Sequence, residues 1–281
     1  MKNFLLILLI IAQVIVLQAQ QYLHPTPYLP YKYKVLDSAN IKITYRLTYL
    51  KDSTQTNNKY SDVQTLLIGS HTSKYFSQQY VDHNNYLKTY QSKAQSVSGV
   101  PKGTLGIEIY KDFKNNKLTT TDLNTDIGGS FLYKEDLPQI AWIILNESLT
   151  ILSYPCQKAT TTFRGRKFEA WFTTGVPINN GPWKFGGLPG LILKVSDTQK
   201  NYIFECIGIE SLSKKEPIKF YETGYKELSR EEYNQLLKKY HKNTIPFVKA
   251  RGGKVLVFHE LSGEIEELKT QSFPYNPLEK E

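Results

Sequence analysis

Residues 181–192 read Gly-Pro-Trp-Lys-Phe-Gly-Gly-Leu-Pro-Gly-Leu-Ile, and half of these twelve positions are glycine or proline. Proline fixes its own φ and donates no backbone hydrogen bond, whereas glycine reaches φ values that other residues avoid. The composition therefore predicts a stretch in which the path of the backbone is tightly constrained. The stretch holds no hydroxyl or thiol nucleophile, no acid and no metal ligand.

The second half of this stretch predicts a rigid turn that leads into a buried strand. Leu188 precedes a proline, which favours an extended conformation, and Gly190 permits a positive φ or a close approach of another backbone. The residues that follow, 191–195, are strand-like and apolar. The alternative is a preformed exposed loop that presents side chains to a ligand or partner, and its contact residues would be Trp183, Phe185 and Leu188.

Two β-hairpins are predicted on either side of this stretch. The segments 151–163 and 167–173 are rich in Thr, Phe and Tyr, and Arg164-Gly165-Arg166 between them is typical of a turn. The segments 191–195 and 202–209 flank a second polar turn. All three tryptophans, Trp142, Trp171 and Trp183, fall in or near this block, which we expect to form the centre of the core.

The remaining segments are also mostly strand-like. Residues 41–50 alternate between apolar and polar side chains, and 255–259 predict a last strand. A helix is expected over 73–90, and a second one begins after Ser229, where Glu232 completes a capping-box pattern. The predicted fold is mostly β, with minor α: a curved antiparallel sheet or half-open β-barrel with one or two packed helices.

The N-terminus has the pattern of a secretory signal peptide. Lys2 is followed by an apolar run from Phe4 to Leu17, and the small residue Ala19 marks the expected cleavage site. The run is shorter than a membrane span usually requires. We expect an exported protein, periplasmic or secreted and soluble after cleavage. The predicted organisation is a signal peptide at 1–19, a Pro/Tyr-rich arm at 20–40, one β-rich domain at 41–260 and a charged tail at 261–281.

Charge and cysteine content limit the class of partner. The 281-residue chain has a formal net charge of +9, but its lysines are scattered, which is typical of a solvated surface rather than a nucleic-acid site. Two cysteines, Cys156 and Cys206, suit an oxidising compartment. They are expected either to form a disulfide or to be two buried thiols.

No catalytic or metal-binding motif is found. The five histidines include no pair at metal-ligand spacing, and neither a G-x-S-x-G nor a phosphate-binding loop sequence is present. We therefore assign no catalytic residue, no metal and no cofactor. If the protein were a hydrolase of peptide or glycan, Asp82, His83 and Glu169 would be candidates for a convergent site.

Gly187-Leu188-Pro189-Gly190-Leu191-Ile192 resembles the signature of the GLPGLI family, exported proteins of unknown function that are characteristic of Bacteroidota. Supporting matches are Tyr154-Pro155-Cys156, Ala170-Trp171-Phe172 and Gly181-Pro182, in the order and approximate spacing of that family. The resemblance covers about 154–195. It implies no catalytic residues, because the family has no established activity. Cys156 fits its pattern, whereas Cys206 does not have a place in it.

Three functions are weighed. The first is an exported, non-catalytic envelope binding or accessory protein, whose concave sheet would suit an apolar ligand such as a lipid or a peptide. The second is a periplasmic hydrolase. The third is a protein that interacts with an outer-membrane receptor through an exposed aromatic patch.

Overall fold

The structure is a computed structural model that describes residues 32–91, 103–124, 127–222, 224–250, 252–258 and 265–280. The expected signal peptide and the arm as far as residue 31 lie outside the described residues. None of the helices within these ranges has the length and apolar character needed to span a bilayer.

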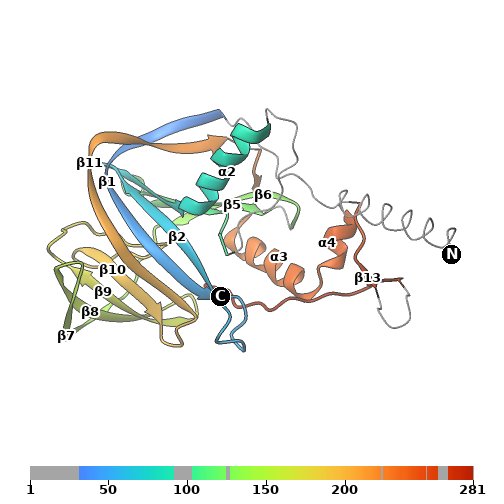
Figure 1. Cartoon of the computed structure of the whole chain (residues 1–281). Coiled ribbons are helices and arrows are strands. Elements are labelled where there is room, and N and C mark those ends of the chain that lie inside the picture. The colour runs from blue at the N-terminus through green and yellow to red at the C-terminus, as the bar shows by residue number, and fades with distance from the viewer. Residues whose placement is uncertain are drawn as a thin grey trace, which may run out of the picture.

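Twelve strands form one continuous sheet (Figure 1). They are β1 (Lys32–Leu50), β2 (Lys59–Ile68), β3 (Thr72–Ser77), β4 (Ile107–Asp112), β5 (Lys117–Asn124), β6 (Gly129–Asp136), β7 (Ile143–Ile151), β8 (Tyr154–Phe163), β9 (Arg166–Thr173), β10 (Leu191–Asp197), β11 (Tyr202–Glu222) and β12 (Lys226–Glu227). Their order is β12-β6-β5-β4-β3-β2-β1-β11-β10-β9-β8-β7. Neighbours run antiparallel except β12 with β6. The sheet curves without closing into a barrel, which confirms the predicted fold class.

The two longest strands, β1 and β11, lie side by side at the middle of the sheet. Their pairing runs from Lys32 opposite Glu222 to Tyr49 opposite Tyr202, with three register shifts. Bulges of this kind increase twist and bend a strand, and Figure 1 shows the bent pair. Residues 32–40, which we assigned to a surface arm, are instead the first half of β1, because their backbone is paired with the end of β11.

Three helices occur in the described residues: α2 (Gln78–Gln91), α3 (Arg230–Lys242) and α4 (Ile245–Ala250). The expected capping box of α3 is confirmed, with Ser229 and Glu232 each binding the backbone of the other. The helix expected from residue 73 begins later, since residues up to Ser77 belong to the fully buried strand β3. Two short strands, β13 (Leu256–Phe258) and β14 (Ile265–Glu267), pair apart from the main sheet.

The main core is enclosed between the two halves of the curved sheet. Its buried members come from both halves, for example Ile43 and Ile109 from β1 and β4, and Phe168 and Phe204 from β9 and β11. Both predicted hairpins, β8–β9 and β10–β11, are present and contribute to it. A smaller cluster lies where Tyr233 of α3 packs against β6.

Candidate functional site

The Gly-Pro-rich segment, residues 181–192, lies between the two halves of the sheet and ends as the start of β10. Three of its glycines are sterically required. Gly187 has a φ of +90°. Gly190 has a φ of +154°, and a Cβ atom at this position would lie only 2.0 Å from the Thr173 carbonyl oxygen. A Cβ on Gly181 would lie 2.9 Å from that of Ile192. The close approach to β9 and β10 explains the glycines at positions 190 and 181, and the positive φ explains the glycine at position 187.

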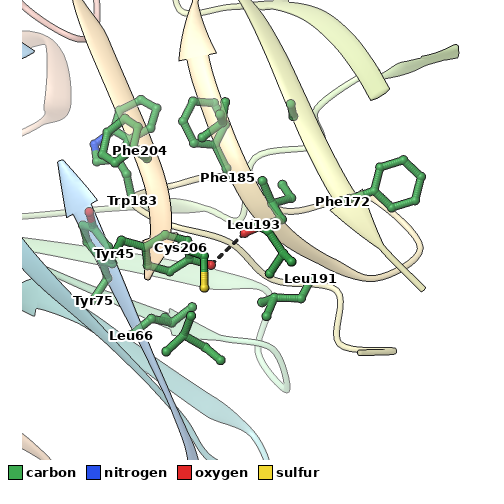
Figure 2. Packing of buried hydrophobic residues seen from close by; sticks show 14 of the residues in the cluster. Tyr45, Leu66, Tyr75, Phe172, Trp183, Phe185, Leu191, Leu193, Phe204 and Cys206 are labelled. Atoms are coloured by element: carbon green, nitrogen blue, oxygen red, sulfur yellow. Dashed lines mark hydrogen bonds between the residues drawn. The ribbon is translucent and has the colours of Figure 1, made fainter. Parts of the chain in front are cut away.

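The three candidate contact residues of this segment are all buried in the core. Figure 2 shows Trp183 and Phe185 there. Phe185 has no exposed surface, and its ring meets those of Phe168 and Trp183 at centroid distances of 4.9 and 5.1 Å in edge-to-face geometry. Leu188 and Trp183 are buried as well. In this arrangement none of the three offers a surface to a ligand or partner. The concave face that we expected to suit an apolar ligand is filled here by these side chains.

A buried lysine on the opposite half of the sheet binds the same segment. Lys111 of β4 donates from Nζ to Asn180 Oδ1 at 2.8 Å, to the Gly181 carbonyl at 3.0 Å and to the Phe185 carbonyl at 2.6 Å. Three acceptors match the three protons of an ammonium group. All three are neutral, and burial lowers the pKa of Lys111 to about 7. This lysine therefore connects β4 to the turn that carries Trp183 and Phe185.

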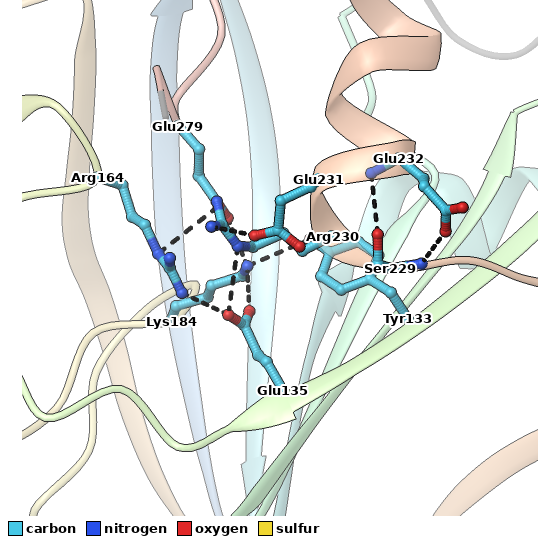
Figure 3. Close-up of polar contacts among 9 residues, drawn as sticks. All are labelled: Tyr133, Glu135, Arg164, Lys184, Ser229, Arg230, Glu231, Glu232 and Glu279. Atoms are coloured by element: carbon cyan, nitrogen blue, oxygen red, sulfur yellow. Dashed lines mark hydrogen bonds and ion pairs between the residues drawn. The ribbon is translucent and has the colours of Figure 1, made fainter.

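Lys184 extends from the segment into a buried ionic cluster (Figure 3). Its Nζ lies 2.5 Å from Glu135 Oε1 of β6 and also contacts the Glu279 carboxylate, while the Tyr133 hydroxyl is 3.2 Å away. Burial alone would lower the pKa of Lys184, but the Tyr133 hydroxyl and the carboxylates of Glu279 and Glu135 outweigh it and raise the pKa to about 12. The lysine is therefore held in its charged form.

Two arginines complete this cluster. Arg164, in the β8–β9 turn, lies 2.5 Å from Glu135, and Arg230, the first residue of α3, lies 3.3 Å from Glu279. The cluster thus joins β6, the β8–β9 hairpin, the Gly-Pro-rich segment, α3 and the C-terminal tail. Each carboxylate is bonded to more than one cation. The arrangement suits structural cross-linking, since neither carboxylate is left free to act as a base.

The hydrolase candidates are not brought together. Asp82 and His83 lie on α2, where the Asp82 carboxylate accepts a hydrogen bond from the Gln78 side chain at 2.8 Å. Glu169 lies on β9, where it is 3.6 Å from Lys200. α2 packs against β2 near the middle of the sheet, and Figure 1 shows it well apart from β9. Among the described residues, no group of three or more His, Cys, Asp and Glu side chains is arranged to hold a metal ion.

The two cysteines are buried free thiols in the structure, so the disulfide alternative is not formed here. Cys156 lies on β8 and Cys206 on β11, and β9 and β10 separate these strands in the sheet. Each sulfur is within hydrogen-bond distance of a backbone carbonyl two residues away. Burial raises the pKa of Cys206 to about 11, which disfavours the reactive thiolate.

The end of the sheet at β7 is exposed and apolar. Within the described residues β7 pairs with β8 alone, and its other edge faces no strand. Ile143 is 66% exposed, Ile144 46% and Leu149 37%. An ion pair on this strand joins Glu147 to Lys158 of β8 at 2.6 Å. At the opposite end of the sheet, by contrast, β6 is covered by β12 and α3.

Sequence reasoning identified the constrained segment but not the polar groups around it. Lys111, Glu135, Arg164, Arg230 and Glu279 were missed because each lies far along the chain from the segment. Lys184 carried a usable signal, since it is the only charged residue among 181–192. A lysine is rarely fully buried unless it is paired, so burial of this segment would imply partners for Lys184.

Comparison with known proteins adds a family match but no activity. Residues 161–194, from β8 through the Gly-Pro-rich segment, match a family model described as a protein of unknown function (Porph_ging). No curated protein matches the chain.

Among solved structures the chain is similar to PNGF-II in a P21 space group, with a TM-score of 0.49 and 16% identity over 79% of this chain and 35% of that one. PNGF-II in a C2 space group gives a TM-score of 0.47 and 17% identity, over 78% and 34%. The chain therefore spans about a third of the length of these proteins. An uncharacterized conserved protein from Thermus thermophilus gives a TM-score of 0.38 and 7% identity, over 68% and 91%. Similarity at these levels says nothing about activity.

Proposed function

We propose that this chain is an exported, non-catalytic binding or accessory protein of the bacterial cell envelope, of the GLPGLI type. The leader pattern of Lys2, the apolar run to Leu17 and Ala19 supports export to the periplasm or beyond. The signature at 187–192 supports the family, and its constrained glycines give that signature a physical reason.

The exposed β7 edge is the observation that favours binding of another polypeptide. An edge strand presents unpaired N–H and C=O groups, and an exposed apolar edge is prone to pairing with a further strand. The apolar side chains of Ile143, Ile144 and Leu149 would pack beside the added strand. The proposed occupant is an extended segment of an envelope protein with apolar or β-branched side chains, because such residues fit a half-buried sheet surface.

The bulge in β7 defines where such a segment would bind. The register of β7 with β8 shifts between Ile144 and Ser148, so the strand consists of two short regular stretches, 143–144 and 148–151. A bulge limits indiscriminate edge pairing by twisting the strand. We therefore expect the partner to pair mainly with 148–151, where four consecutive residues keep regular geometry.

Photo-crosslinking in the native envelope tests this function. A photoreactive amino acid is placed at position 149 in the full chain, and the matched control is position 265, where Ile265 is 61% exposed on β14. We expect one envelope polypeptide to crosslink from 149 and not from 265. Leu149→Lys should abolish that crosslink from a probe at position 151.

Three results obtained with the same envelope preparation would contradict the proposed function. Equal crosslinking from 149 and 265 would show that the β7 edge has no selectivity. A lipid that copurifies at one molecule per chain, found by native mass spectrometry in the absence of a polypeptide crosslink, would favour the apolar-ligand function instead. A crosslink from 149 to a second copy of this chain would identify the edge as a self-association site and reject a heterologous partner.

A further inference from the structure

The C-terminal tail, residues 271–280, returns to the sheet in an irregular extended path. It belongs to no helix or strand, so it is held by contacts with side chains rather than by a ladder of backbone hydrogen bonds. Its last described residue, Lys280, donates its backbone N–H to the Arg164 carbonyl at 3.0 Å. These features resemble a bound peptide more than an integral part of the sheet.

The contacts of Asn276 and Pro277 are those of peptide recognition. Arg166 of β9 donates from Nε to the Pro277 carbonyl at 3.0 Å and from Nη2 to Asn276 Oδ1 at 2.6 Å. Tyr202 donates its hydroxyl to the Asn276 carbonyl at 2.5 Å, and Asn276 Nδ2 donates to the Leu50 carbonyl at 2.8 Å. Both the side chain of Asn276 and the backbone around it are therefore bound specifically.

Glu279 occupies the anionic position of this site. Its carboxylate contacts Lys184, lies 3.3 Å from Arg230 Nη1 and lies 3.8 Å from Arg164 Nε. Its side chain is only 9% exposed. The four cations that surround the tail are called the groove here (Arg164, Arg166, Lys184 and Arg230). Without Glu279, they would face the buried carboxylates of Glu135 and Asp197 and the exposed carboxylate of Glu231. A buried excess of positive charge favours an acidic occupant.

The groove is held in shape by contacts that do not involve the tail. Arg166 is fixed by Asp197 at 3.0 Å, and Tyr202 stacks on Tyr49 with ring centroids 5.9 Å apart. Lys184 and Arg164 are both fixed by Glu135. Because each of these groups keeps a second partner, the binding geometry is expected to persist when the tail leaves. Such preorganisation reduces the cost of binding a separate peptide.

We infer that this groove is a binding site for acidic extended peptides of the form Asn-Pro-x-Glu, and that the chain's own C-terminal tail is its resident ligand. The same segment from a second copy binds the groove in trans when the tail of the first copy is released. This site is separate from the β7 edge and does not depend on a function for that edge.

A labelled peptide of residues 271–281 tests the inference, with binding measured by fluorescence anisotropy at fixed salt. The full chain carrying Asn276→Ala and Glu279→Gln should bind the peptide about tenfold or more tightly than the wild-type chain, in which the tethered tail competes. The matched control peptide carries Glu279→Gln. Its affinity for the variant chain should be about tenfold or more lower, because a charge-assisted contact is lost.

The inference is overturned if the peptide binds both chains equally, or if its affinity does not depend on Glu279. Circular dichroism first establishes that the double variant is folded. If it is not, Asn276→Ala alone serves, since it keeps the charge of the cluster and removes only the amide contacts to Arg166 and Leu50. In that case, the peptide must bind the Asn276→Ala chain more tightly than it binds the wild-type chain.

Discussion

At Gly190 the backbone passes too close to β9 for any side chain. A Cβ there would lie 2.0 Å from the Thr173 carbonyl oxygen, and φ is +154°. We predict that Gly190→Ala lowers the free energy of unfolding by about 3 kcal/mol or more, because the start of β10 or the end of β9 must move in a close-packed core. Urea denaturation followed by tryptophan fluorescence measures the change.

Gly128→Ala is the matched control for this substitution. Gly128 also has a positive φ, +90°, but a Cβ there would meet nothing within 4 Å. Gly128→Ala should therefore lower the free energy of unfolding by only about 1–2 kcal/mol, which is the cost of a positive φ for a residue with a Cβ. Equal losses at both glycines would mean that the close approach to Thr173 is not what fixes glycine at position 190.

Lys111 makes a pH-dependent contribution to stability. Its pKa falls from an ordinary value of 10.5 to about 7 in the folded protein. Between pH 7 and pH 10 the unfolded chain therefore binds the extra proton, so this contribution to stability is present at high pH and is lost as pH falls through 7. Relative to Lys111→Met, the wild-type free energy of unfolding should rise by about 2 kcal/mol from pH 7 to pH 9.

Denaturation of the two proteins across that pH range measures this difference. Because the other titrating groups are shared, subtraction isolates Lys111. A difference that stays flat between pH 7 and pH 9 would mean that the three acceptors hold Lys111 charged throughout. Lys42, a lysine on β1 outside this cluster, provides the control as Lys42→Met.

At the scale of elements, local signals in the sequence were sufficient for hairpins and for one helix. Arg164 and Gly165 both have positive φ, as the turn between β8 and β9 requires. The boundary between β3 and α2 was missed for a physical reason. β3 is fully buried although it is polar, and its Lys74 is neutralised by Glu108 at 2.8 Å on the neighbouring strand. An ion pair between two strands leaves no pattern in the local sequence, so a buried polar strand of this kind cannot be predicted from that sequence.

The capping box of α3 is expected to stabilise its first turn measurably. The Ser229 hydroxyl accepts from the Glu232 backbone N–H at 3.1 Å, and the Glu232 carboxylate accepts from the Ser229 N–H at 2.7 Å. Ser229→Ala should lower the free energy of unfolding by about 1 kcal/mol. Ser229→Asp, which retains a capping oxygen and adds charge at the helix N-terminus, should restore it. Chemical denaturation distinguishes the two, and equal losses would contradict a capping role.

At the scale of the whole molecule, the order of the strands and the ionic cluster could not be read from the sequence. β1 pairs with β11, and Lys184 meets Glu135 and Glu279, which lie in distant parts of the chain. One sequence contains no record of such long-range pairs. The constraint on residues 181–192 was visible because it is expressed in backbone chemistry, whereas the surrounding charges become meaningful only when the sheet curves.

The cluster around Lys184 should behave as a coupled unit that holds these distant parts together. Removing one partner leaves an uncompensated buried charge, so Lys184→Met and Glu135→Gln should each lower the free energy of unfolding by about 3 kcal/mol or more. The double variant should lose less than the sum of the two by at least about 1 kcal/mol. The control cycle uses Lys117 and Asp136, a pair at 2.5 Å whose side chains are 58% and 71% exposed. Its coupling should not exceed about 1 kcal/mol, because solvent screens the pair. If the losses of Lys184→Met and Glu135→Gln are additive, the two side chains do not stabilise each other through charge pairing. The cluster would then hold the sheet, α3 and the tail together by packing alone.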